Sequence, residues 1–383
     1  MKLRSKTGFS LVMFFGFCTY TLISTQIVPY LTSLGYSPIQ RGYVLSMASV
    51  ISIVGQMVAG YISDRYKTVR KLFIYLTVVM VLTAFMSFTV GIENYWYHFF
   101  MIGMGNGVSR IALNLLESWI MEVDGLQPEF GAIRAFGSLG WSLFSLAAGF
   151  LITSFGYPSL AITIGVFSLV VMFFAAQLPD ANKIETKKVE LSDLKLLFKN
   201  KDFIILIVIY LIAFISYNAD SITLTDYMIE LGGDESIIGL RWFVQASIEI
   251  PTMFIGYRIL RRKGSHWMLV VGVSALALKL VGSGIAANNT IIIMLGALQL
   301  FCYPFLLLSQ KDLIYKEIPP HLRSTGQLVA VSLSIGLAGA LTPIISGMLV
   351  ETFGIQMALY IFALILLVPV MLLGFLSPRE AVK

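Results

Sequence analysis

The sequence predicts an all-α integral membrane protein with twelve transmembrane helices in two parallel six-helix pseudo-repeats. Three observations lead to this prediction. Of the 383 residues, 57% are hydrophobic and 13% are charged, about half the charged share of a soluble domain. Apolar stretches recur from one end of the chain to the other, each long enough to cross ~30 Å of hydrocarbon as a helix. Basic residues gather in alternate loops, the distribution that the positive-inside rule describes.

The apolar stretches define the twelve spans in order. Three basic residues precede the first span, and residues 1–7 lack the small-residue pattern of a cleavage site. We therefore expect the first span to remain as an uncleaved anchor. The predicted spans are residues 9–31, 39–62, 72–91, 97–121, 130–153, 157–178, 203–226, 237–260, 267–286, 289–314, 325–350 and 355–377.

The 27 Lys and Arg residues set the predicted topology. Most lie in the N-terminal tail, after spans two, six, eight and ten, and at the C-terminal end, whereas the alternate loops are nearly bare. Both termini are therefore expected in the cytoplasm, in a multi-pass protein of the plasma (inner) membrane, which requires an even number of spans. The net charge of +6 then reflects topology and not nucleic-acid binding. The expected partners are the bilayer and a small-molecule substrate, with the chain acting as a monomer.

The polar stretch 179–202 lies at the midpoint and predicts a cytoplasmic linker between a bundle over 1–178 and a bundle over 203–383. Residues 149–156 match residues 347–354 at an offset of 198, and Gly60-Tyr61 with Arg65 matches Gly256-Tyr257 with Arg261 at an offset of 196. Either match alone can arise by chance between apolar helices, but two concordant offsets favour a parallel repeat. Because six is even, both halves enter the membrane in the same orientation and can rock about a site between them, which is alternating access.

The loop after span two resembles the signature loop of the major facilitator superfamily. It contains Gly60, then Asp64 with Arg65, and later the basic pair Arg70-Lys71, while Lys67 replaces the second Gly of the pattern. The resemblance implies that Asp64 and Arg65 latch the cytoplasmic side of the two halves together. The alternative is that these charges only enforce topology, which is our interpretation of the basic pair.

A second resemblance concerns spans four and five. Glu117 and the segment 130–141, with Arg134 and Trp141, are similar to the corresponding region of lactose permease and its oligosaccharide:proton symporter relatives. The resemblance implies that the Glu and the Arg bind sugar hydroxyls and that the Trp stacks on the sugar ring. Lys279 matches an intramembrane Arg of the permease, and Asp220 lies near its span-seven acid.

The departures from the permease concern proton coupling. Gln299 and Cys302 stand where the permease has a His and a Glu, and Gly296 and Ile335 stand where it has lysines. Its coupling machinery is therefore not carried over. The resemblance therefore places the chain in a lactose-permease-like branch, nearer the permeases for phenylpropionate or nucleosides than those for lactose.

Physical reasoning on the same residues supports a solute site. Glu117 and Arg134 flank the turn between spans four and five at equal distances, so they come level across a helical hairpin and can pair or bind a polyol. Arg110 lies two helical turns before Glu117, could compete for it, and favours an anionic group on the substrate. Trp141 shares the face of Arg134 and either stacks on a ring or packs between helices. Asn218 and Gln299 complete the predicted substrate-binding set.

A proton carrier must be a carboxylate, because the three histidines all lie at predicted membrane edges. Burial favours the neutral carboxyl and a nearby cation favours the carboxylate, so protonation is coupled to the breaking of an ion pair. We rank Glu249 first, Asp220 second and Glu117 third, with Lys279 as the cation for either of the first two. For Asp220 a static ion pair is an alternative of similar weight.

These observations predict a proton-coupled symporter that imports a small polar solute, a sugar or glycoside, by alternating access. The alternatives are a proton-driven multidrug or aromatic-compound antiporter or permease, and a sensor with a transporter fold. An enzyme is not expected, because no paired metal ligands, nucleophile elbow or phosphate loop is present. No cofactor or metal site is expected, and the proton gradient is the energy source.

Overall fold

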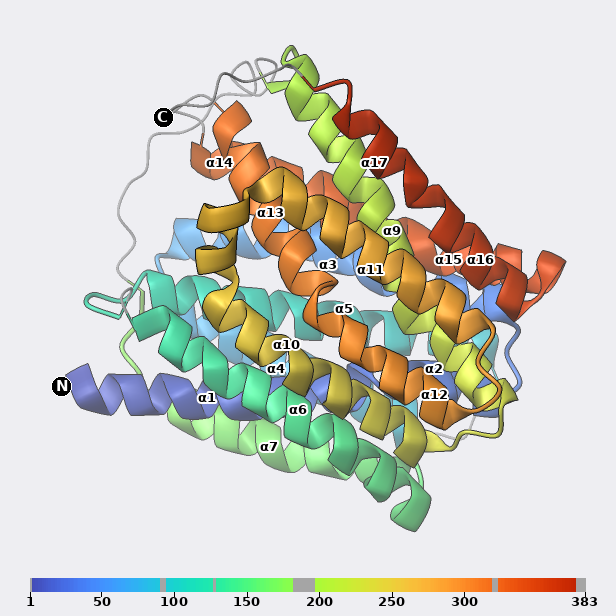
Figure 1. Cartoon of the computed structure of the whole chain (residues 1–383). Coiled ribbons are helices and arrows are strands. Elements are labelled where there is room, and N and C mark those ends of the chain that lie inside the picture. Colours follow the sequence, from blue (N-terminus) through green and yellow to red (C-terminus); the bar gives the residue numbers. More distant parts are fainter. Residues whose placement is uncertain (1, 90–93, 127–128, 182–196, 319–322, 377–383) are drawn as a thin grey trace. The chain divides into compact units, whose positions relative to one another are not determined.

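The structure is a computed structural model, and it describes all residues except 1, 90–93, 127–128, 182–196, 319–322 and 377–383 (Figure 1). The described residues form helices joined by turns, with no β-strand among them, so the all-α prediction is confirmed for this part of the chain. The helices are α1 (Lys2–Ser24), α2 (Ile27–Ser33), α3 (Pro38–Tyr66), α4 (Arg70–Thr89), α5 (Tyr95–Met121), α6 (Phe130–Phe155), α7 (Pro158–Gln177), α9 (Lys201–Glu230), α10 (Glu235–Lys263), α11 (Ser265–Gly284), α12 (Asn289–Leu295), η2 (Gly296–Leu300), α13 (Tyr303–Glu317), α14 (Arg323–Val331), η4 (Ser332–Gly336), α15 (Leu337–Phe353), α16 (Ile355–Ile365) and α17 (Leu367–Leu373).

Within the described residues, 11 helical segments are long and apolar enough to cross a membrane. They coincide within a few residues with all the predicted spans except 237–260. Helix α10 occupies that stretch and has 29 residues, a length of ~44 Å. It carries Glu235, Arg241 and Glu249 and ends in a basic cluster, so it falls short of the apolar composition of the others. The eighth predicted span, and with it the total of twelve, therefore remains a prediction.

Several spans are interrupted by a short irregular segment. Thr25 and Gln26 separate α1 from α2, a 3₁₀ turn (η2) links α12 to α13, and a π-helical turn (η4) lies between α14 and α15. Such irregular turns within membrane-spanning helices commonly lie at functional sites. One of them, η2, contains Gln299.

The chain divides into two compact units. One consists of Met1–Glu185 with Met228–Ser247, and the other of Thr186–Tyr227 with Ile248–Lys383. We call them the first and the second unit. The predicted linker 179–202 lies largely outside the described residues, so the predicted domain boundaries stay a prediction.

The first half of α10 belongs to the first unit because it packs closely on α6. A Cβ atom at Gly149 would lie 2.4 Å from the Glu235 carbonyl oxygen, and one at Gly239 would lie 2.5 Å from the Ser145 carbonyl oxygen. Only glycine allows this approach of the two backbones.

The core of the first unit surrounds Trp119 of α5. Its ring lies 5.0 Å from that of Phe9 on α1 and 5.8 Å from that of Phe73 on α4. Its indole N–H donates to the Pro179 carbonyl at 3.0 Å. Helix α1 packs against α6 and α7, and α5 packs against α3 and α4. These contacts fix the faces of α5 and α6 that carry the predicted site.

In the second unit, hydroxyl hydrogen bonds tie α9 to its neighbours. Tyr210 donates to Ser309 of α13 at 2.9 Å, Ser216 donates to the Phe362 carbonyl of α16 at 2.9 Å, and Thr223 pairs with a Ser of α15 at 2.6 Å. Interhelical hydroxyl contacts of this kind are a usual means of association inside a membrane. They position the face of α9 that carries Tyr217 and Asp220.

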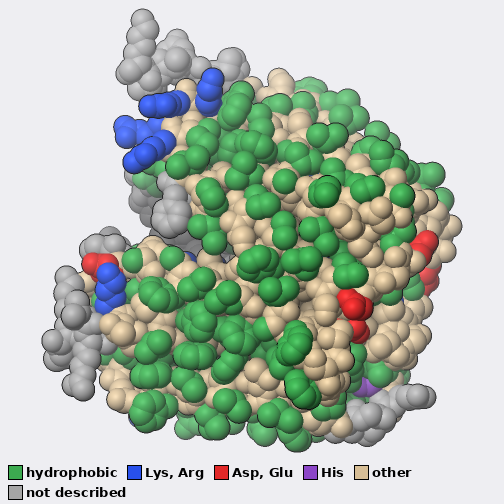
Figure 2. All heavy atoms as spheres, turned by 60° about the horizontal axis from the view of Figure 1, so that its bottom comes forward, with side chains coloured by type: hydrophobic (Ala, Val, Ile, Leu, Met, Phe, Trp, Pro, Cys, Tyr) green, Lys and Arg blue, Asp and Glu red, His purple; other side chains and the backbone are tan. Residues whose placement is uncertain are grey.

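The outer surface is apolar, as expected for contact with lipid. On the face shown in Figure 2, hydrophobic side chains predominate over charged ones. Helix α7 shows the pattern in detail, because Ile162, Val166, Leu169 and Phe173 recur at helical spacing and are each more than half exposed. An apolar stripe of this kind in water would mark an interaction surface. Here it indicates a multi-pass membrane protein.

Candidate functional site

Glu117 of α5 and Arg134 of α6 form an ion pair in the first unit. The Arg134 Nε atom lies 2.6 Å from Glu117 Oε1, and the two side chains are 35% and 32% exposed. The guanidinium also lies over the Phe17 ring, 4.3 Å from its centroid, and donates to Ser138 at 3.3 Å. The expectation that the two residues come level across the hairpin agrees with this geometry. A pair that remains one-third exposed can open to bind a solute.

Trp141 lies on α6 two turns after Arg134 and is partly buried. Its ring lies 5.4 Å from that of Tyr20 on α1 and 6.0 Å from that of Trp242 on α10. Part of its surface therefore packs between helices, as the structural alternative expects. Tyr20 and Trp242 add aromatic surface that sequence reasoning did not include.

Arg110 does not pair with Glu117. Its Nη1 atom donates to the Ser49 hydroxyl of α3 at 3.2 Å, and its buried Nε atom has no hydrogen-bond partner among the described residues. The suggestion that Arg110 competes for Glu117 therefore finds no support in this arrangement. The guanidinium thus has a neutral partner on one side and a buried donor that no described group satisfies.

A polar stripe on α5 connects these residues. Asn106, Arg110, Asn114 and Glu117 follow one another at spacings of three or four residues and thus share one face of the helix. Asn106 is buried with its side-chain oxygen unpaired in the described structure, whereas Asn114 is exposed. Sequence reasoning missed both Asn residues, although their helical spacing from Arg110 was the available signal.

The second unit brings four of the predicted residues into one network. Lys279 of α11 donates to Asp220 of α9 at 2.7 Å and to the side-chain oxygen Oε1 of Gln299 at 2.8 Å. The side-chain exposures of Lys279 and Asp220 are 0% and 2%. Gln299 in turn donates from Nε2 to Glu249 Oε1 at 2.6 Å. Lys279 therefore contacts Asp220 directly, and hydrogen bonds through Gln299 link it to Glu249.

The network also includes an aromatic pair that the sequence did not indicate. The Gln299 Nε2 atom lies 3.1 Å from the Tyr217 hydroxyl, and the Tyr217 ring stacks on Tyr303 with centroids 5.2 Å apart. Asn218, predicted to bind substrate, is half-buried beside Tyr217 and has no hydrogen bond to another described side chain. Aromatic plates beside polar donors suit the binding of a ring with one apolar side.

The predicted latch residues lie at the end of α3. Arg65 is exposed and donates to Tyr61 of its own helix at 3.0 Å, a Cβ at Gly60 would meet nothing within 4 Å, and the Asp64 side chain lies outside the described part. Lys67, in place of the second Gly of the signature, adopts a left-handed conformation with φ of 50°, which glycine adopts without strain. The departure from the pattern thus occurs where the backbone favours Gly.

A different acid, Asp180, holds the loop between α3 and α4. It accepts hydrogen bonds from the Thr68 hydroxyl at 2.5 Å and from the backbone N–H groups of Val69 and Arg70 at 2.9 and 3.0 Å. It therefore caps the start of α4 from a distant part of the chain. Burial raises the pKa of Asp180, but four hydrogen bonds from backbone and hydroxyl donors outweigh it, and the pKa is lowered below its ordinary value.

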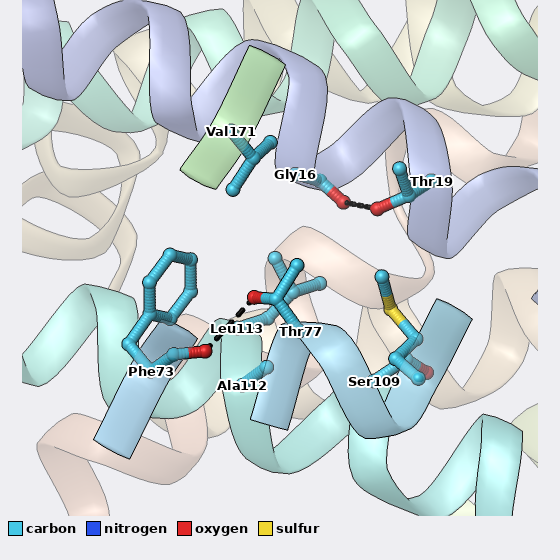
Figure 3. Close-up of a pocket in the computed structure, with 9 residues that line it drawn as sticks. Gly16, Thr19, Phe73, Thr77, Ser109, Ala112, Leu113 and Val171 are labelled. Carbon is cyan, nitrogen blue, oxygen red and sulfur yellow. Dashed lines mark hydrogen bonds between the residues drawn. The ribbon is translucent and has the colours of Figure 1, made fainter. Parts of the chain in front are cut away.

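A small cavity in the first unit has none of these residues in its lining (Figure 3). It is lined by α1, α4, α5 and α7 and has a volume of about 10 Å³, room for about one water molecule. The hydroxyls of Thr19 and Thr77 beside it donate to carbonyls of their own helices. The cavity is too small for a solute.

No group of three or more His, Cys, Asp or Glu side chains suited to a metal ion occurs among the described residues. Cys18 and Cys302 are free and buried. His98 lies in the first turn of α5, where it is fully buried and shares a hydrogen bond of 2.6 Å with the Tyr36 hydroxyl.

The fold is that of a transporter of the major facilitator superfamily. Residues 7–362 match the MFS_1 like family, and the chain belongs to that family. The family prediction is confirmed.

Two curated relatives and one solved structure show what the chain resembles. It is 23% identical to the putative nucleoside transporter YegT of Escherichia coli K12 over 92% of this chain and 85% of the relative. It is 22% identical to the maltose permease of Geobacillus stearothermophilus over 98% and 95%. The crystal structure of the nucleoside transporter NupG matches with a TM-score of 0.84 and 16% identity over 98% and 99% of the two chains. These proteins are transporters and not enzymes, as expected.

Proposed function

We propose that the protein is a proton-coupled symporter that imports a small polar solute, a sugar or glycoside, by alternating access. The observation that carries this proposal is the network of Asp220, Lys279, Gln299 and Glu249 within the membrane-spanning part of the second unit. Two carboxylates and one ammonium give it a net charge of −1, and one proton makes it neutral. Because an uncompensated charge is costly inside a membrane, such a network favours movement in the protonated form.

Glu249 is the proposed proton carrier. Asp220 has Lys279 in direct contact, whereas Glu249 receives only the neutral amide of Gln299 in the contacts described above. A carboxylate without its own cation binds a proton at lower cost than one in an ion pair. Asp220 and Lys279 then act as a fixed pair that responds to Glu249 through Gln299.

The substrate-binding residues that we propose from the sequence are Glu117, Arg134, Trp141 and Arg110, which lie in the first unit, and Asn218 and Gln299, which lie in the second. The accessible carboxylate and guanidinium provide charge-assisted hydrogen bonds to hydroxyl groups, and the Trp ring provides an apolar plate. Relatives described as maltose permease and nucleoside transporter support a solute with a sugar ring.

The remaining parts of the proposal concern architecture and location. We propose twelve spans in two six-helix repeats, with α10 as the eighth span, in the plasma (inner) membrane with both termini cytoplasmic. Gly60, Asp64 and Arg65 form the proposed conformational latch. The protein works as a monomer, needs no cofactor and takes its energy from the proton gradient.

Transport in liposomes tests the proposal. We would impose an inward proton gradient and measure uptake of labelled sugars, glycosides and nucleosides by wild type, Glu117→Gln, Arg134→Ala and Glu249→Gln. We expect uphill uptake of one class, loss of binding in the first two variants, and loss of uphill uptake with retained exchange in Glu249→Gln. Expulsion of hydrophobic cations driven by the same gradient, without solute uptake, would instead identify a proton-driven antiporter.

A further inference from the structure

Arg110 is the deepest charged residue of α5. The helix runs from Tyr95 to Met121, so Arg110 lies two residues from its midpoint, a distance of ~3 Å along the axis. Glu117 lies two turns nearer the end of the helix. A cation at the middle of a membrane-spanning helix is costly and is retained for a partner or a function.

The described structure gives Arg110 only a neutral partner. Its contact is the Ser49 hydroxyl at 3.2 Å, its Nε atom is buried without a hydrogen bond, and no described acid lies within ion-pair distance. Other intramembrane cations differ, because Arg134 contacts Glu117 and Lys279 contacts Asp220. A guanidinium held from one side by a hydroxyl presents its remaining donors in a fork that suits two oxygen atoms.

Two further polar side chains lie on the same face of α5 as Arg110. The Asn106 oxygen, one turn away on the same face, is buried without a partner in the described structure, and Asn114, one turn in the other direction, is exposed. Polar atoms in a membrane interior are normally hydrogen-bonded. This stripe is therefore built to contact a polar ligand and not lipid.

We infer that the solute carries an anionic group, a carboxylate or phosphate, which Arg110 binds while Asn106 and Asn114 contact neighbouring polar atoms. This inference rests on the proposed solute transport and specifies the class of solute. Trp141 lies within ~3 Å of the midpoint of α6 along its axis. An aromatic plate at the depth of the guanidinium suits a compound in which a ring bears the acid.

Binding measurements on matched neutral and acidic compounds test the inference. The probes are benzamide and benzoate, nicotinamide and nicotinate, and methyl glucoside and glucuronate, titrated against purified protein by tryptophan fluorescence. We expect at least one acid to bind about 10- to 100-fold more tightly than its neutral counterpart, the gain typical of a charge-assisted hydrogen bond. Arg110→Gln should remove this preference and leave the weaker neutral affinity.

Two further variants separate a specific role from a folding defect. Arg110→Lys keeps the charge and should retain part of the preference for the acid. Arg258→Gln removes an exposed basic residue at the far end of α10 and should change nothing. If Arg110→Gln does not fold, an acid preference that persists in Arg110→Lys and falls in Asn106→Leu supports the inference.

The possible failures are distinguishable. Equal affinity for acids and neutral compounds in wild type, or an acid preference that survives in Arg110→Gln, overturns the inference, as does binding of none of the six probes. Gradient-driven uptake of a neutral sugar that needs Glu117 and Arg134 would then leave the proposed transport function intact. Loss of all solute transport would overturn the function itself.

Discussion

The two intramembrane ion pairs differ mainly in their access to solvent. Glu117 and Arg134 are each about one-third exposed, whereas Lys279 and Asp220 are buried. The separations are nearly equal, at 2.6 and 2.7 Å, so distance alone does not distinguish them. Water or a solute can replace either partner of the accessible pair, but removal of one partner from the buried pair leaves a charge with no solvent. The first pair is suited to ligand exchange and the second to a fixed framework.

The largest effect is expected from breaking the buried pair. Lys279→Met leaves Asp220 buried without its cation and should cost about 3–5 kcal/mol of stability. The double variant Lys279→Met with Asp220→Leu should recover most of this loss, because no uncompensated charge remains. Thermal unfolding in detergent compares the three proteins. A single variant as stable as wild type would remove the distinction between the two pairs.

The next effect concerns the link between the buried pair and Glu249. Gln299→Leu removes one acceptor and two donor contacts and should cost about 1–3 kcal/mol, since buried polar groups lose their partner. The half-buried Asn218, without a described hydrogen bond, provides the matched control, and Asn218→Leu should change stability by less than about 0.5 kcal/mol. If the unfolding curves of the two variants coincide, the hydrogen bonds of Gln299 do not contribute to stability.

Asp180 differs from Glu117 and Asp220 because neutral donors, and not a cation, hold its carboxylate. Asp180→Ala should lower stability by about 1 kcal/mol, the usual value of a helix cap. Because the folded pKa of Asp180 is lowered, its contribution is fully present above the unfolded pKa of about 3.9 and is lost as pH falls through the folded pKa. Melting temperatures of wild type and variant, measured from pH 7 to pH 3, should converge at the acidic end. A constant difference would show that the carboxylate charge is not involved.

The smallest effect on stability is expected at the accessible pair. Glu117→Gln should cost less than about 1 kcal/mol, because solvent-accessible ion pairs contribute little. The same substitution should abolish solute binding if the proposed site is correct. Thermal unfolding and equilibrium binding on one preparation separate the two effects. A large loss of stability with unchanged binding would reverse the roles assigned to the two pairs.

Local patterns in the sequence predicted the all-helical fold and the pairing of Glu117 with Arg134. Glu117 and Arg134 lie in one helical hairpin. Helical spacing and the short turn were therefore enough to predict that the two residues lie at the same depth along the two helices. The second network differs because its members Lys279, Asp220 and Glu249 come from different helices. Their spacing in the sequence did not predict which of the two acids pairs with Lys279. Asp180 was missed, because its partners lie more than 100 residues away at Thr68 to Arg70.

The sequence by itself determined that this protein is helical, multi-pass and a member of a transporter superfamily. Apolar length and the placement of basic residues are properties of each segment in its solvent, so they can be read without tertiary contacts. Only the tertiary structure decided that Lys279 contacts Asp220 directly and Glu249 through Gln299, and that Arg110 contacts Ser49 instead of Glu117. Those pairings depend on the rotation and depth of each helix against its neighbours, which packing and not composition sets.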